Sequence, residues 1–126
     1  MDFYCIGDAP STVPELPRDV GIVALSGEID YHASAALKEH LTREIQAGRR
    51  RIVIDLSEVT FIDSTAIGLL VGTNAKLQEL ASGRLVLACP QENWRVHRIL
   101  DVAGIAGVTD LHSSLEQAVT TLAVAA

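Results

Sequence analysis

The run Arg51-Ile-Val-Ile-Asp-Leu56 decides the fold, because it is apolar on both faces and too short for a helix. Such a strand is typical of the centre of a sheet that is covered from both sides. Leu85-Val-Leu-Ala-Cys89 repeats the pattern, and Pro90 ends it. Two buried strands with a helical pattern between them predict parallel strands joined by a crossover helix.

Outward from these two strands, the sequence alternates between helix and strand patterns. We expect helices from His32 to Ala47, from Asp63-Ser64 to near Ser82-Gly83, from about Glu92 to Ala103, and after a capping box at Ser113 and Glu116. Further strands are expected at Phe3–Ile6, Gly21–Leu25 and Ile105–Thr109. The order predicts an α/β fold: a mostly parallel central sheet of four to five strands with about four helices.

The composition is typical of one domain, with 126 residues, 48% of them hydrophobic and 21% charged. We interpret 1–126 as a single domain, with a partly irregular N-terminal segment over 1–20 and a core over 21–123. No apolar stretch approaches the roughly 20 residues that cross a bilayer, so we expect a cytoplasmic protein without a membrane partner. The formal net charge of -6 argues against a nucleic-acid partner.

Cofactor and metal sites are not indicated. Cys5 and Cys89 have neither the density of a disulfide scaffold nor the spacing of a zinc site. Two idle thiols are the simplest interpretation, and a redox switch between them stays open. The sequence also lacks a phosphate-binding glycine loop, so we expect no nucleotide cofactor.

The segment Thr60-Phe-Ile-Asp-Ser-Thr-Ala-Ile-Gly68 places a hydroxyl, that of Ser64, in the first turn of the second expected helix. The free N–H groups and the dipole of a helix N-terminus favour negative charge, so a phosphate on Ser64 would be tolerated there. The simpler alternative is that Asp63 or Ser64 only caps the helix, and the two roles are compatible.

The outward face of the same helix is unusual. It is expected to carry Thr65, Gly68, Leu69, Gly72 and Lys76, so that two glycines and an exposed leucine replace the usual charged residues. Glycine inside a helix costs about 1 kcal/mol relative to alanine. We interpret this flat face beside Ser64 as a docking surface. The alternative is that the glycines permit close packing within the protein.

At these residues the chain resembles the STAS domain family, and within it the stand-alone bacterial anti-sigma factor antagonists. Ala24-Leu-Ser-Gly-Glu-Ile-Asp30 resembles the strand-ending element of the family. Ile54-Asp-Leu-Ser-Glu-Val-Thr-Phe-Ile-Asp-Ser-Thr-Ala-Ile-Gly68 resembles its phosphorylation segment, with Ala66 where many members carry glycine.

The resemblance implies a function and roles for three residues. Ser64 would be phosphorylated by an anti-sigma factor with serine kinase activity, Asp63 would support the site, and Asp30 would lie near it. The mechanism would be partner switching: the unphosphorylated domain binds the anti-sigma factor, which frees a sigma factor, and the phosphorylated domain lets go. A phosphoserine phosphatase would be the further partner.

Two other functions compete with this one. A serine-dependent enzyme would need a base for Ser64, for which His32 is the only candidate, and the Gly-x-Ser-x-Gly elbow is missing, so we do not expect an enzyme. A STAS interaction module could also bind its partner constitutively, or under redox control, without phosphorylation of Ser64.

Overall fold

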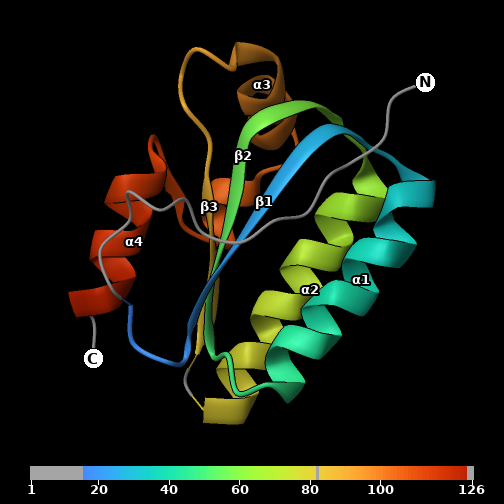
Figure 1. Ribbon diagram of the computed structural model, residues 1–126. Helices are drawn as coiled ribbons and strands as arrows, with labels where there is room; N and C mark the ends of the chain where they lie inside the picture. Colours follow the sequence, from blue (N-terminus) through green and yellow to red (C-terminus); the bar gives the residue numbers. More distant parts are fainter. Residues whose placement is uncertain (1–15, 82, 125–126) are drawn as a thin grey trace.

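The computed structural model describes residues 16–81 and 83–124 and shows an α/β fold in which a four-stranded sheet alternates with helices (Figure 1). The elements are β1 (Val20–Ile29), α1 (Tyr31–Gln46), β2 (Arg51–Ile62), α2 (Ser64–Ala81), β3 (Arg84–Ala88), α3 (Trp94–Val102), a 3-10 turn (Ile105–Gly107), β4 (Leu111–His112) and α4 (Leu115–Val124). The strands follow one another across the sheet in chain order, and all neighbouring pairs are parallel. The expected α/β fold is therefore confirmed.

The sheet is covered on both faces, as the apolar run in β2 predicted. Ile52 and Ile54 belong to the larger core, which α1, α2 and α3 cover. Val53 belongs to a smaller core on the opposite face, which α4 covers. Figure 1 shows α1 and α2 side by side on one side of the strands and α4 alone on the other. Within the described helices, none is long and apolar enough to cross a membrane.

Strand β2 is longer than the sequence suggested, and its extra length positions the site. It pairs with β3 only as far as Asp55, opposite Ala88. Beyond that point it continues beside β1 alone, through two register shifts, to the pair formed by Ile29 and Ile62. The tip of β2, followed directly by α2, therefore projects beyond the middle of the sheet.

The C-terminal elements differ from the expected ones. The strand expected at Ile105–Thr109 is wrong: Gly104 adopts a left-handed conformation with φ +71°, and a 3-10 turn follows before the short β4. The last helix is capped one residue later than expected, since Ser114 Oγ accepts a hydrogen bond from Gln117 N–H at 3.0 Å. The strand expected at Phe3–Ile6 lies outside the described residues.

The first residue of β2, Arg51, has a structural role. Arg51 forms two hydrogen bonds with the carboxylate of Asp19, both at 2.8 Å, and also donates to the carbonyl of Leu122 in α4. The hydrogen bond from Arg51 lowers the pKa of Asp19 below its usual value. Arg51 thus ties the starts of β1 and β2 to the C-terminal helix.

Candidate functional site

Ser64 is presented by a turn that Asp63 holds in place. The backbone N–H of Asp63 donates to the carbonyl of Ile29 at 3.2 Å, which joins the tips of β1 and β2. Asp63 Oδ1 then accepts a hydrogen bond from Ala66 N–H at 2.9 Å, so Asp63 is the N-cap of α2. Ser64 is the next residue, and it is exposed in the first turn of the helix.

The same arrangement occurs at the end of β1. Asp30 is the N-cap of α1: its Oδ1 accepts a hydrogen bond from Ala33 N–H at 3.0 Å, and its carbonyl accepts one from Ser34 Oγ at 3.0 Å. Because the bond from Asp63 reaches Ile29, the residue before Asp30, the two capped helix starts lie at the same edge of the sheet. The positive ends of two helix dipoles therefore lie near Ser64.

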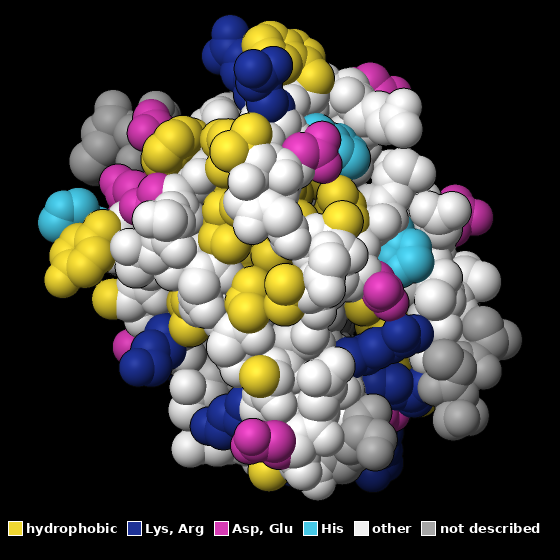
Figure 2. Space-filling model, turned by 180° about the vertical axis from the view of Figure 1, so that it is seen from behind, with side chains coloured by type: hydrophobic (Ala, Val, Ile, Leu, Met, Phe, Trp, Pro, Cys, Tyr) yellow, Lys and Arg dark blue, Asp and Glu magenta, His cyan; other side chains and the backbone are white. Residues whose placement is uncertain are grey.

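An apolar hollow lies beside Ser64, between the start of α2 and α3. It has a volume of about 350 Å³ and is lined by Ser64, Ile67, Arg98, Ile99, Val102 and Ala103. Figure 2 shows hydrophobic side chains gathered over α2 and α3 on this side of the molecule. Sequence reasoning missed the α3 residues. A signal for them was present in the sequence: Trp94, Arg98 and Val102 recur every four residues, so they share one face of the helix. In the structure this face is exposed to solvent.

The outward face of α2 agrees with the expected pattern except at one residue. Thr65, Gly68, Gly72 and Lys76 are exposed, whereas Leu69 is half-buried and packs against the core rather than standing free. A Cβ added to Gly68 or Gly72 would meet no atom within 4 Å. Within the part of the chain that the structure describes, the glycines therefore do not serve close packing, contrary to that alternative.

The structure places the histidines as follows. No histidine lines the hollow beside the serine among the described residues. His32 is exposed and packs edge-on against Tyr31, with ring centroids 5.6 Å apart. His97 Nε2 lies 2.8 Å from the carbonyl oxygen of Cys89 and is engaged there. In the parts of the chain that the structure describes, no three His, Cys, Asp or Glu side chains are grouped to hold a metal.

Cys89 is poorly suited to redox control. Its side chain is fully buried at the end of β3, and burial raises the pKa of its thiol to about 11. Thiolate is the form that reacts, so the folded protein holds Cys89 in its unreactive form near neutral pH. Cys5 lies outside the described residues.

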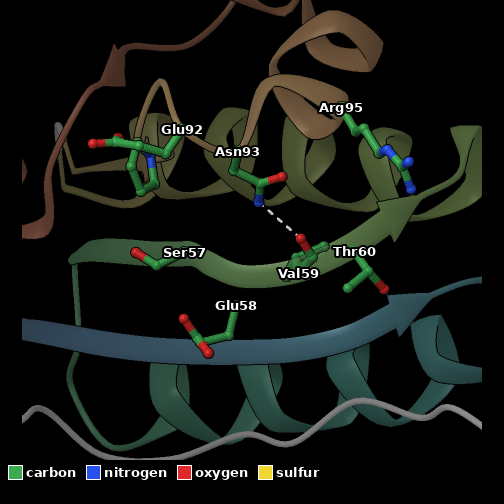
Figure 3. A pocket seen from close by; sticks show the side chains of 8 residues that line it. Ser57, Glu58, Val59, Thr60, Glu92, Asn93 and Arg95 are labelled. Carbon is green, nitrogen blue, oxygen red and sulfur yellow. Dashed lines mark hydrogen bonds between the residues drawn. The ribbon is translucent and has the colours of Figure 1, made fainter.

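A second hollow, of about 610 Å³, lies beside the outer half of β2, beyond the point where its pairing with β3 ends. It is lined by Ser57, Glu58, Val59, Thr60, Pro90, Glu92, Asn93 and Arg95. Figure 3 shows Asn93 directed at the strand, where its Nδ2 donates to the carbonyls of Leu56 and Val59 at 3.1 and 2.7 Å. Asn93 thus satisfies strand carbonyls that β3 leaves unpaired, which is a structural role.

Comparison with known proteins identifies the fold family. The family model described as the STAS domain matches residues 12–118. The chain belongs to the STAS domain family. The anti-sigma F factor antagonist of Paenibacillus polymyxa is 32% identical to this STAS domain over 85% of the chain and 90% of the relative. The anti-sigma-B factor antagonist of Staphylococcus aureus is 30% identical over 75% of this chain and 84% of the relative.

A solved structure agrees with the fold. The crystal structure of an anti-sigma factor antagonist from Mycobacterium paratuberculosis superposes on this STAS domain with a TM-score of 0.77, at 23% identity, covering 94% of this chain and 93% of that one. The resemblance found in the sequence is thus confirmed, as is the STAS fold. The curated relatives are anti-sigma factor antagonists, which are regulators and not enzymes, so the expectation of a non-enzymatic protein is also confirmed.

Proposed function

We propose that this STAS domain is a cytoplasmic anti-sigma factor antagonist that works by partner switching. Its unphosphorylated form binds an anti-sigma factor with serine kinase activity, and the sigma factor held by that protein is released. The kinase then transfers the γ-phosphoryl group of ATP to Ser64 Oγ, with loss of the hydroxyl proton and formation of ADP, and the complex dissociates. A phosphoserine phosphatase restores the binding form. The relatives named as anti-sigma factor antagonists support this assignment.

The observation that carries the proposal is that Asp63 caps α2 and leaves Ser64 exposed and free of that role. Asp63 supplies the cap of α2, so the helix does not need the serine hydroxyl. Ser64 is exposed, and its hydroxyl forms no hydrogen bond with any residue that the structure describes. A kinase can therefore reach the acceptor without opening the fold, and the helix dipole favours the phosphate once it is attached.

The proposed partner surface surrounds this serine. It comprises Asp30, Asp63, Ser64, Thr65, Gly68, Leu69, Gly72 and Lys76. A phosphate adds up to about two negative charges to this surface. Charge that must be desolvated in an interface without a matching partner opposes binding, so phosphorylation is expected to weaken the complex.

Intact-mass and phosphosite analysis tests the proposal. The purified protein is incubated with ATP and the candidate anti-sigma kinases of its source, with Ser64→Ala and Thr65→Ala as matched hydroxyl deletions. A single phosphoryl group on Ser64, present in Thr65→Ala and absent in Ser64→Ala, is expected. A phosphoryl group that persists in Ser64→Ala would contradict the assigned residue. A stable complex without any modification would indicate constitutive binding.

Binding measurements with the same kinase test the switch itself. Ser64→Ala is expected to retain the complex, and Ser64→Asp or Ser64→Glu to weaken it, because only the acidic side chains place charge at the interface. Equal affinity of all these forms would refute switching by charge.

A further inference from the structure

A groove between α1 and α2 has apolar side chains at its floor. The two helices lie side by side on the same face of the sheet (Figure 1), and the groove between them has a volume of about 310 Å³. Leu41 is buried at its base, and Ile45 and Leu69 line it as half-buried side chains. The groove thus presents hydrophobic surface next to the outward face of α2.

The two lysines of the sequence, Lys38 and Lys76, both line this groove, one from each helix. Both side chains are exposed, and neither forms an ion pair with any residue that the structure describes. No acidic residue is among the described residues that line the groove. The charged residues that line the groove are therefore positive only, beside apolar surface, on a chain with a formal net charge of -6. This surface complements a partner segment that carries carboxylates next to apolar side chains.

The two hydroxyl groups of the groove need no hydrogen-bond acceptor from an occupant. Thr42 Oγ1 donates to the carbonyl of Lys38 at 2.8 Å, and Thr73 Oγ1 donates to that of Leu69 at 2.8 Å. Both hydroxyl protons are therefore used inside their own helices. The open space over Gly68 and Gly72 allows the backbone of an occupant to come close. A helix suits such a groove, because the backbone groups in its middle are already paired.

We propose that this groove is the docking site for an amphipathic helix of the anti-sigma factor, whose apolar side chains lie between α1 and α2 and whose carboxylates reach Lys38 and Lys76. The inference rests on the proposed function and extends the partner surface to α1. It also relates that surface to the switch. The groove begins at Gly68, which follows Ser64 by four residues and therefore lies about 6 Å from it along the axis of α2 at 1.5 Å per residue. A phosphate on Ser64 would repel the near end of an acidic helix.

Charge reversal with a matched control tests the groove. The full chain carrying Lys38→Glu and Lys76→Glu is compared, by calorimetric titration with the anti-sigma factor at low ionic strength, with a chain carrying Arg43→Glu and Arg95→Glu. The two double variants have the same net charge, and Arg43 and Arg95 are exposed residues that do not line the groove. We expect the lysine variant to bind roughly tenfold more weakly or worse, and the arginine variant to stay within roughly threefold of the original. Thermal melting by circular dichroism verifies that both are folded.

The outcomes separate this inference from the proposed function. Failure of the unaltered chain to bind any anti-sigma factor overturns both. A complex that the two double variants form equally well overturns the groove alone, and so does tighter binding by the lysine variant, which would indicate a basic partner segment. Self-association of this chain that only lysine reversal disrupts would assign the groove to a second copy and would also overturn the proposal.

Discussion

Replacing Asp63 with alanine and with asparagine separates the two ways in which this residue stabilises the start of α2. Alanine removes both the hydrogen bond to Ala66 N–H, at 2.9 Å, and the negative charge at the helix N-terminus. The cap is worth about 1 kcal/mol and the charge about 0.5 kcal/mol, so Asp63→Ala should lower the free energy of unfolding by about 1.5 kcal/mol. Asparagine keeps the hydrogen bond, so Asp63→Asn should cost only about 0.5 kcal/mol.

Urea unfolding followed by circular dichroism measures these differences directly, and thermal melting should show a Tm lower by roughly 5 °C for Asp63→Ala. Added salt should reduce the difference in the free energy of unfolding between the original chain and Asp63→Asn, because salt screens the charge. The difference between Asp63→Asn and Asp63→Ala should not change, because it comes from the hydrogen bond. Glu39→Ala, at an exposed position in the middle of α1, is the control. Equal stability of the alanine and asparagine variants would refute the capping role.

Three further changes test other features of the structure. Gly72→Ala should stabilise the chain by up to about 1 kcal/mol, since the added Cβ meets no atom within 4 Å; lower stability in urea would show that the position is constrained. Asn74→Ala should destabilise by about 1–3 kcal/mol and speed hydrogen exchange at Leu85, because Asn74 Oδ1 accepts from that buried N–H at 2.9 Å; unchanged exchange would contradict this. In a Cys5→Ser background, Cys89 should react with Ellman's reagent at pH 8 far more slowly when folded than in urea, since burial raises its pKa to about 11; equal rates would contradict the burial argument.

The strands buried on both faces could be predicted from the sequence, whereas strands paired on one side were harder to recognise. Ile52–Ile54 and Leu85–Leu87 form unbroken apolar runs because helices cover both faces there. In the outer half of β2, buried Val59 lies between exposed Glu58 and Thr60, an alternation typical of a strand that is covered on one face. This stretch lacks the unbroken apolar run that marked Arg51–Leu56, and its partner, β1, is distant in the sequence.

The candidate site was predictable where it depends on one stretch of chain. Asp63, Ser64 and the glycines of α2 follow one another, so their relation to a helix start could be inferred from spacing. Arg98 could not be found in this way, because it shares a hollow with Ser64 only through the position of α3 relative to the start of α2. The half-burial of Leu69 could not be predicted either, because it depends on how this side chain packs against the core.

The confinement of both lysines to one groove matters for how this protein is handled. Apart from the α-amino group, these are the only primary amines in the sequence. Amine coupling to a sensor chip, or labelling with an amine-reactive dye, would therefore attach the matrix or the fluorophore at the surface assigned to the partner. Attachment through an affinity tag leaves that surface accessible. A comparison of partner binding with the two attachments would show whether the groove takes part in binding.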